Sequence, residues 1–570
     1  MKKILILIGA IVAVIAAGIY YYITLPAINI HSVGFWGFII SILAVIFVWN
    51  LARANMTSIK RRLKGEESVD SKVDFSLASK VWGYILFGFI AIYFIGTLLG
   101  SPIVNARRYQ KLLSVEKGDF TTDVAEVDYN KIPLLDKESA SLLGDRKMGS
   151  MVEFVSQFEA ASDYTQINYQ DKPVRVTPLE YASPIKWFTN MRDGIPAYIR
   201  IDMTTQETEC VMLSEGMKYS KSEYFNRNIY RHLRFNYLTY IFGDQIFFEI
   251  DEEGTPFWIC PVKKFNIGLF GGETVGRVVV VNAISGECVD YKVEEVPTWI
   301  DKVYSAELLT RLYDYSGIYV NGYLNSVLSQ RGCLQTTNGY NYLAMDDDVW
   351  VYTGVTSLNA DQSNVGFVLM NQRTMQTKYY EVEGAIEDSA MSSAQGQVQH
   401  LGYRATFPLL LNVRSEPTYF MALKDQAGLV KKYAMVNVQK YQLVAIGDTI
   451  KECETNYYDL LITNGILENV DIGVQVPITE GESYLETIVG TVGSIYPVVV
   501  DGNSCLYMYI YTDDPSDKRA FTFKIDLTNP ELTAALNIET GDSIAVQYLE
   551  NGDFSSSRVL WIREVVAILQ

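Results

Sequence analysis

The sequence predicts a membrane-anchored α+β protein with three N-terminal transmembrane helices, repeated units of one helix plus an antiparallel β-meander, and a C-terminal five-stranded β-barrel. Three observations predict this fold class. Long apolar runs occupy the N-terminal part, a polar turn between two β-rich runs recurs at intervals of 80 and 89 residues, and five short β-rich runs end the chain. Such recurrence is typical of a repeated supersecondary unit.

The composition is that of a folded chain whose acidic residues lie outside its N-terminal part. Of the 570 residues, 49% are hydrophobic, and the formal net charge is −18. Residues 1–104 contain nine basic and four acidic residues, which leaves 105–570 with a net charge of −23. An acidic body of this size repels nucleic acid and anionic lipid surfaces. The composition therefore predicts no nucleic-acid partner.

Three apolar runs are predicted to cross the lipid bilayer, namely Ile4–Leu25, Phe35–Ala52 and Val81–Leu99 within the segment 1–104. About 20 apolar residues in a helix cover the roughly 30 Å of a bilayer core. A cleaved signal peptide is the alternative interpretation of the first run, because Lys2 and Lys3 precede it. The length of this run, and the two runs that follow it, favour an uncleaved anchor.

The basic residues predict the orientation in the membrane. The connection 53–80 carries seven lysines and arginines, whereas the connection 26–34 carries none. Cytoplasmic loops carry such an excess. The N-terminus and the basic loop 53–80 are therefore predicted to be cytoplasmic, and residues 105–570 extracytoplasmic. Arg107, Arg108 and Lys111 oppose this assignment but are outnumbered.

Residues 105–149 are expected to form a stalk with a short helix near Lys137–Leu143. Helices are then predicted after two S-x-x-E capping boxes, at Ser150–Glu153 and Ser220–Glu223. A third helical stretch covers about 301–330 and breaks near two glycines. The fourth covers about 385–401, where the residues on one face are Ala390, Ala394, Val398 and Leu401.

Pairs of β-rich runs flank the recurring turn in Ala197–Leu213, Gly276–Tyr291 and Gly366–Tyr380. In each pair an Asp or Asn ends the first run, Thr or Ser follows three residues later, and Glu or Gln follows five residues later. Side chains of these types hydrogen-bond a reversing backbone. The sequence therefore predicts α+β repeats over 150–462, at about 150–219, 220–297, 298–383 and 384–462. The fourth is degenerate, with Asn437 in the turn position and Gln442 five residues on.

A helix followed by a β-meander with the turn Val281–Glu287 resembles the PepSY domain of secreted and membrane-anchored bacterial proteins. The resemblance covers about 150–445. Only Ser285–Gly286–Glu287 reproduces the family's turn, because the turns at 204–207 and 373–376 lack the glycine. The resemblance implies an extracytoplasmic binding or inhibitory module that acts on envelope proteases. It carries no catalytic residues to transfer.

After a polar linker, 463–483, the segment 484–570 predicts five strands. Its strand and turn pattern is similar to that of an OB-fold barrel. Such barrels bind nucleic acid through basic grooves and stacked aromatic residues. Tyr507, Tyr509 and Tyr511 alternate in the second strand, but Asp513, Asp514 and Asp517 follow them. An acidic barrel of this kind is predicted to be a protein-contact or structural module.

No motif of metal, cofactor or catalytic chemistry is found in the sequence. The three histidines, His31, His232 and His400, lie far apart, and no HExxH motif is present. His232 is assigned to a helix surface. Ser183 and Lys186 are spaced as in S-x-x-K, but Pro184 disfavours the helix that would join them. The sequence therefore predicts no catalytic, cofactor-binding or metal-ligating residue.

Three further features are given structural interpretations. The six cysteines have no CxxC spacing; mostly unpaired thiols are favoured over a Cys210–Cys288 disulfide. The glycine-rich segment Phe265–Arg277 lacks the Lys-Ser/Thr pair of a P-loop and is interpreted as a mobile hairpin connection. The acidic clusters Asp251–Glu253 and Asp346–Asp348 are interpreted as solvated turns.

These observations favour a non-enzymatic, membrane-anchored envelope protein whose repeats bind or regulate an envelope protein or peptide partner. Edges of small sheets suit capture of an extended segment by strand addition. The alternative is an envelope hydrolase that acts on peptide or glycan with carboxylates from an acidic cluster. A pocket holding two carboxyls with raised pKa values would favour the hydrolase. Nucleic-acid binding by the barrel would require the opposite topology and a basic groove.

Overall fold

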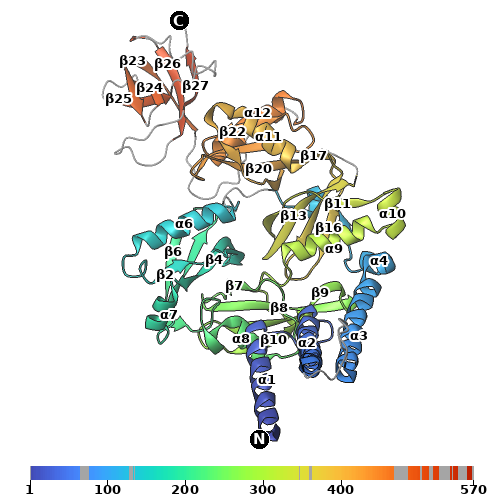
Figure 1. The fold of residues 1–570 in the computed structure, drawn as a ribbon. Helices are drawn as coiled ribbons and strands as arrows, with labels where there is room; N and C mark the ends of the chain where they lie inside the picture. The colour runs from blue at the N-terminus through green and yellow to red at the C-terminus, as the bar shows by residue number, and fades with distance from the viewer. Residues whose placement is uncertain are drawn as a thin grey trace. The chain divides into compact units, whose positions relative to one another are not determined.

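The computed structural model describes residues 2–63, 76–126, 132–133, 135–345, 347–358, 363–467, 485–500, 503–511, 518–524, 540–541, 543–549 and 562–567. The chain divides into a first unit, Met1–Leu467, and a second unit, Glu468–Gln570. Helices and several antiparallel sheets make up the first unit, and one five-stranded sheet makes up the second (Figure 1). The mixed α+β class is therefore confirmed. The boundaries assigned to the individual repeats stay predictions.

Three apolar helices begin the chain: α1 (Lys2–Thr24), α2 (Val33–Leu63) and α3 (Leu77–Gly100). Two segments, Val33–Met56 and Leu77–Gly100, are long and apolar enough to cross a membrane. The apolar part of α1 whose side chains are described, Ile11–Thr24, is shorter. Two membrane-spanning candidates therefore stand, and the third predicted span, Ile4–Leu25, stays a prediction. Much of the basic loop, 64–75, lies outside the described residues.

Residues 105–149 do not form a stalk, and that prediction is wrong. The short helix α4 (Pro102–Gln110) follows α3, and β1 (Glu116–Gly118) pairs in parallel with β16 (Thr377–Tyr380). Leu113, Phe120 and Val124 are buried in two different cores. The scattered apolar residues of this segment are therefore anchors that tie it to the folded sheets.

The helix expected after Ser150 is also wrong, because the helix precedes that residue. α6 (Lys137–Ser150) begins at Asp136, whose carboxylate accepts the Ser139 N–H at 2.9 Å. Ser150 donates its hydroxyl to the Lys147 carbonyl at the last turn. After it come turns and β2 (Phe158–Ala160). Aspartate is as good an N-cap as serine. Here Asp136 caps a helix that ends at Ser150, where the prediction had a helix begin.

Each large sheet of the first unit contains a four-stranded meander that follows the chain order. The first has β3 (Thr165–Tyr169), β4 (Lys172–Tyr181), β5 (Ile195–Asp202) and β6 (Thr208–Met217). The second has β7 (Phe247–Ile250), β8 (Pro256–Ile267), β9 (Gly271–Asn282) and β10 (Cys288–Lys292). The third has β12 (Asn341–Met345), β13 (Asp348–Ser357), β15 (Gly366–Asn371) and β16. The fourth has β19 (Leu409–Val413), β20 (Glu416–Lys424), β21 (Val430–Asn437) and β22 (Val444–Gly447).

A helix precedes each meander: α6, then α8 (Ile229–Asn236), α9 (Ala306–Ile318) and α11 (Glu387–Gln397). The remaining short elements are α5 (Phe120–Asp123), α7 (Pro184–Asn190), η2 (Phe225–Arg227), η3 (Val293–Glu295), α10 (Tyr323–Leu328), β11 (Leu334–Thr336), β14 (Ser363–Asn364), β17 (Gly384–Ala385), η4 (Gln399–Leu401), β18 (Arg404–Ala405) and α12 (Ile450–Thr463). The predicted break in the third helical stretch is confirmed between α9 and α10. The Ser220 hydroxyl accepts the Glu223 N–H as expected, but α8 begins only at Ile229. Leu401 is 40% exposed, so it does not share the buried face of α11.

The three matching turns close with the same hydrogen bonds. The Asp202, Asn282 and Asn371 side chains each accept the backbone N–H groups two and three residues ahead, at 2.8–2.9 Å. The residue four positions after each of them is left-handed, with φ of 62°, 79° and 65° at Gln206, Gly286 and Met375. The two turns that lack glycine therefore have the same backbone conformation as the turn with Gly286. In the fourth sheet the Asn437 side chain accepts from Lys440 N–H. The Asn437 N–H donates to the Leu443 carbonyl, six residues ahead, whereas the corresponding bond in the other turns spans five residues.

Neighbouring sheets pack face to face, because strand residues alternate between two cores. In β9, Val279 and Val281 enter the core shared with the first sheet, while Val278 and Val280 enter the core shared with the third. In β15, Val368 faces that same core and Phe367 faces the core shared with the fourth sheet. Continuous apolar runs are the expected pattern for strands buried on both faces.

The second unit has five strands, β23 (Leu485–Val500), β24 (Asn503–Tyr511), β25 (Lys518–Lys524), β26 (Ser543–Leu549) and β27 (Ile562–Ala567). The first four confirm the prediction; the fifth is predicted at 558–564, of which β27 covers only 562–564. Their order is β25-β24-β23-β26-β27. Among the described residues no pairing joins β25 to β27, so no closed barrel is found. Asp513, Asp514 and Asp517 lie outside the described residues.

Candidate functional site

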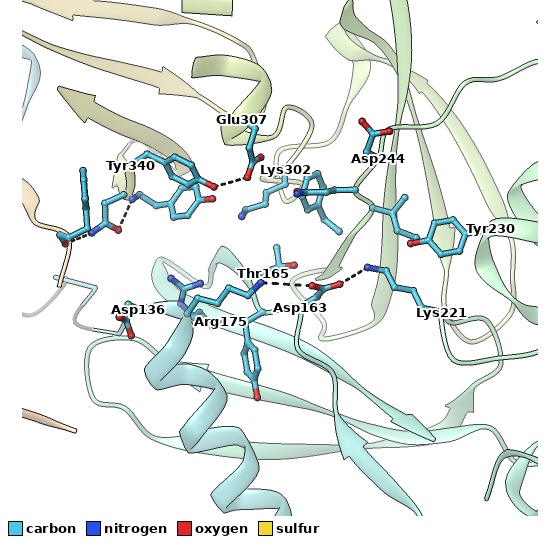
Figure 2. A pocket seen from close by; sticks show the side chains of 18 residues that line it. Asp136, Asp163, Thr165, Arg175, Lys221, Tyr230, Asp244, Lys302, Glu307 and Tyr340 are labelled. Carbon is cyan, nitrogen blue, oxygen red and sulfur yellow. Dashed lines mark hydrogen bonds and ion pairs between the residues drawn. The ribbon is translucent and has the colours of Figure 1, made fainter. Parts of the chain in front are cut away.

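A cavity of about 480 Å³ lies in the first unit, where the first three meanders meet (Figure 2). Its walls come from the initial strands of those meanders and the segments before them, together with Arg175 in β4 and Phe407 before β19. They include Thr165 in β3, Phe247 in β7 and Tyr342 in β12. β3, β7 and β12 each pair with a single strand of their own sheet, so three sheet edges face this region. Such a volume is typical of ligand pockets.

Most acidic groups that line the cavity are already bound to partners. Asp163 accepts from Lys221 at 2.8 Å, which lowers the pKa of its carboxyl. Burial opposes ionisation of Asp136, but the Lys424 ammonium at 2.5 Å keeps its pKa below the ordinary value. Glu307 is likewise desolvated, yet its pKa is lowered by the Tyr340 hydroxyl at 2.7 Å. These carboxylates are therefore ionised and paired at neutral pH.

Two cations that line the cavity have no carboxylate partner among the described residues. Arg175 is 5% exposed; its Nε donates to the Leu135 carbonyl at 3.1 Å, and one terminal nitrogen lies 3.5 Å from Gln166 Oε1. Lys302 is 6% exposed, and its ammonium lies 4.5 Å from the centre of the Tyr342 ring and 5.6 Å from that of Phe247. Burial lowers the pKa of Arg175, but an arginine remains charged at neutral pH.

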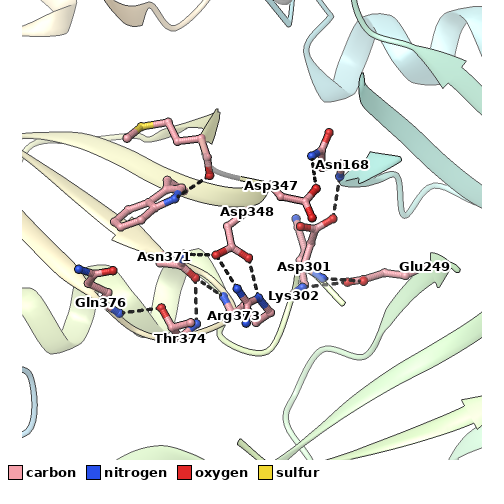
Figure 3. A network of polar contacts seen from close by, with 12 residues as sticks. Asn168, Glu249, Asp301, Lys302, Asp347, Asp348, Asn371, Arg373, Thr374 and Gln376 are labelled. Carbon is pink, nitrogen blue, oxygen red and sulfur yellow. Dashed lines mark hydrogen bonds and ion pairs between the residues drawn. The ribbon is translucent and has the colours of Figure 1, made fainter. Parts of the chain in front are cut away.

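A buried polar network lies beside this cavity (Figure 3). Glu249 accepts the backbone N–H groups of Asp301 and Lys302, each at 3.0 Å. Asp301 accepts the Asn168 N–H at 2.7 Å, and its other carboxylate oxygen is buried without a partner among the residues that the structure describes. The network thus joins the first and second meanders to the segment before α9. It also fixes the backbone of Lys302 at the cavity wall.

The two buried carboxyls of this network have raised pKa values. Burial raises the pKa of Glu249 to about 7. Burial and the nearby charge of Glu249 raise the pKa of Asp301 well above its ordinary value. The side chains are 0% and 1% exposed, however, so no substrate can touch them. They are structural acids and do not form the pocket that a hydrolase would need.

The acidic clusters interpreted as solvated turns have different outcomes. Asp251–Glu253 is a turn, in which Asp251 accepts from Glu253 N–H and Thr255 N–H. Within the second cluster Asp348 is 6% exposed and forms a two-pronged ion pair with Arg373, at 2.6 and 2.8 Å. That part of the prediction is wrong, because the following hairpin supplies Arg373, a half-buried cation. Asp346 lies outside the described residues.

The glycine-rich segment is not a mobile connection. It forms the β8–β9 hairpin, whose tip contacts the N-terminal helices: Leu269 packs on Gly96 of α3, and Phe270 packs on Tyr93 and Trp36. His31 Nδ1 lies 2.8 Å from the Leu269 carbonyl oxygen. The glycines are needed because backbones approach closely at Gly100 and Gly271, where a Cβ would overlap the Gly100 carbonyl. The second sheet is thereby seated on α2 and α3.

The remaining sequence features have structural roles. Pro184 occupies the first turn of α7, and Ser183 is its N-cap, so proline did not prevent that helix. His232 is half-buried and bonds the Gly286 carbonyl at 2.8 Å instead of lying on a helix surface. Five cysteines are free thiols, including Cys210 and Cys288. Within the described ranges no group of three metal-ligating side chains converges.

Neither Arg175 nor Lys302 stood out in the sequence. Arg175 lies in the run Pro173–Pro178, which is buried throughout in β4 and in which Arg175 is the one charged residue. A lone cation inside a buried strand is a sign of a special environment, because unpaired charges are rarely fully buried. Lys302 lies in a segment predicted as helix, where a lysine is unremarkable.

The fold and the cavity define a mixed α+β protein with apolar N-terminal helices and a charged cavity. No protein-family model matches the chain, and no curated protein matches it in sequence. Among solved structures, a mutant of Synechocystis apocarotenoid oxygenase is 9% identical, with a TM-score of 0.15; the match covers 73% of this chain and 67% of that one. The intramolecular trans-sialidase from Ruminococcus gnavus is 8% identical over 72% of this chain and 94% of its own, with a TM-score of 0.11. These weak likenesses carry no argument about fold or function.

Proposed function

We propose that this chain is a membrane-anchored protein whose extracytoplasmic body binds, and thereby regulates, another protein of the cell envelope without catalysing a reaction. One observation carries the proposal: the cavity at the junction of three sheets presents two buried cations that lack a carboxylate partner among the described residues. Such a cavity suits ligand binding by charge. The sheet edges that line it suit an extended segment.

Several finer assignments belong to this proposal. α1 forms a third span, the connection 53–80 is cytoplasmic, and the OB-like second unit has a contact or structural role. The PepSY-like turn supports an envelope module. The seating of the second sheet on α2 and α3 supports it too, because a body held against the membrane helices stays close to other membrane proteins.

The hydrolase alternative receives less support. It needs a carboxyl with a raised pKa that a substrate can reach. The carboxyls of Asp136, Asp163 and Glu307, which line the cavity, have lowered pKa values. Glu249 and Asp301, whose pKa values are raised, are buried and do not line the cavity.

Site-specific photo-crosslinking in cells tests the proposal. A photoreactive amino acid replaces Gln245, which is exposed and lines the cavity. The matched control replaces Gln399, an exposed glutamine of η4 that does not line the cavity. We expect one discrete adduct, with a single envelope protein, at position 245 only. Identical adducts at both positions, or none at 245, would contradict binding through this cavity.

A further inference from the structure

We propose that the cavity recognises acidic side chains, with Arg175 and Lys302 as the residues that bind the carboxylate. The inference rests on the proposed binding function and names the chemistry of the partner, an extended segment rich in aspartate or glutamate. Figure 2 shows Lys302 extending into the cavity from one wall while Arg175 lies at another.

Burial is the first argument. An uncompensated buried charge costs several kcal/mol, roughly, so buried cations are normally paired. Both Arg175 and Lys302 are more than nine-tenths buried, yet neither has a carboxylate within salt-bridge distance among the described residues. Asp136, Glu249 and Glu307 act on these cations only from beyond salt-bridge distance. An acidic side chain entering the cavity would supply the direct contact with a carboxylate.

The second argument is that the other cations are occupied. Lys221 is bound to Asp163, and Lys137 lies 3.9 Å from the same carboxylate. A ligand would therefore find Arg175 and Lys302 available, while these neighbouring pairs keep their internal partners. A guanidinium also offers several donors in a fixed plane, which matches the two oxygens of a carboxylate.

The third argument is the wall around these cations. Tyr342 and Phe247 flank the Lys302 ammonium, and Phe407 also lines the cavity. Aromatic walls exclude water, and a charge-assisted hydrogen bond gains strength where water is excluded. They also offer apolar surface for the residue beside the acidic one. The overall charge of −18 does not oppose local binding, because charges beyond about 8 Å are largely screened at physiological salt.

Titration calorimetry on the full-length chain in a non-ionic detergent tests the inference. The probes are the end-blocked peptides Gly-Glu-Phe-Glu-Gly and Gly-Gln-Phe-Gln-Gly, which differ only in charge. We expect the glutamate peptide to bind about tenfold more tightly, the effect of one charge-assisted hydrogen bond. Equal affinities would overturn the inference.

Variants identify the responsible groups. Lys302→Met keeps an unbranched apolar stem between the two rings but removes the charge, so it should abolish the preference for glutamate. Arg175→Gln should do the same, and Arg175→Lys should restore part of it. The matched controls Lys440→Gln and Arg146→Gln change exposed residues that do not line the cavity and should keep the full preference.

The outcomes separate the two proposals. Arg175→Gln could lower the unfolding midpoint so far that the variant cannot be titrated. In that case the test rests on Lys302→Met, and an unchanged preference for glutamate in this variant overturns the inference. A single adduct at position 245 with no preference for the glutamate peptide would contradict the acidic ligand but support the binding function. A clear preference for the glutamate peptide without an adduct in cells would support the acidic ligand and contradict binding to an envelope protein.

Discussion

At the scale of single residues, the left-handed position of the recurring turn shows why one copy has glycine and two do not. Gln206 and Met375 have the same positive φ as Gly286, so the conformation alone does not demand glycine. Gly286 differs because the Tyr219 ring covers it, and a Cβ there would overlap that ring. The tyrosine, together with His232 on the Gly286 carbonyl, makes this turn part of a packed contact.

We therefore expect Gly286→Ala to destabilise the protein by more than about 1 kcal/mol, through backbone strain plus overlap. The matched control, Gln206→Ala, retains a Cβ in the same conformation and should change stability by less than about 0.5 kcal/mol. Chemical unfolding in mild detergent measures both. Equal effects would show that the Tyr219 contact does not decide the residue at this position.

The Glu249 and Asp301 carboxyls make stability depend on pH in a definite direction. The folded pKa of Glu249, about 7, lies above its ordinary value of 4.5. The folded protein therefore holds a proton that the unfolded chain releases between these values. The stabilisation is complete below the unfolded pKa and is lost as pH rises through the folded pKa.

Raising the pH from about 5.5 to about 7.5 should thus lower the free energy of unfolding, by up to about 1.4 kcal/mol per pH unit for each proton. Asp301→Asn removes one titrating group and can still accept the Asn168 N–H, so the variant should lose part of this dependence. The control Asp171→Asn alters an exposed residue and should follow the wild type. A wild-type profile in Asp301→Asn would contradict the assignment.

At the scale of elements, the β8–β9 hairpin couples the second sheet to the apolar helices. Its tip is close to Gly96 and Gly100 of α3, and the Tyr109 hydroxyl of α4 bonds the Gly100 carbonyl at 2.7 Å. In α8, the helix that precedes this sheet, Arg234 donates to the Leu25 carbonyl at 2.9 Å, just after α1. The sheet is therefore held at two separate places.

Gly271→Ala should displace the hairpin tip, because the added methyl group would overlap the Gly100 carbonyl and the Tyr109 hydroxyl. We expect a lower thermal unfolding midpoint in detergent, corresponding to about 1–3 kcal/mol of overpacking. Gly88→Ala is the matched control, since it lies in α3 with no atom near its new Cβ. A midpoint unchanged by Gly271→Ala would argue against the observed seating.

At the scale of the whole molecule, the side of the membrane decides every functional proposal. The basic residues of 53–80 favour an extracytoplasmic body. Protease treatment of intact cells, probed with an antibody to the C-terminus, should therefore remove the signal of the fragment 111–570. Full protection, in cells whose known surface proteins are cleaved, would place the body in the cytoplasm and contradict the envelope proposal.

The sequence by itself determined the local features of this protein. Alternating and continuous apolar runs predicted the strands in both units, because side chains on a strand alternate between two faces. The turns at Asp202, Asn282 and Asn371 were predictable for the same local reason: each side chain bonds the backbone only two and three residues ahead. Apolar runs long enough for a bilayer predicted α2 and α3.

Only the tertiary structure decided which residues from distant segments meet. Arg175 and Lys302 face one cavity although 126 residues separate them, and Arg373 reaches Asp348 from the next hairpin. The tip of β8–β9 is ordered by helices more than 150 residues earlier in the chain. Contacts of this kind depend on how sheets stack, and burial, charge pairing and close backbone approach arise only from that stacking.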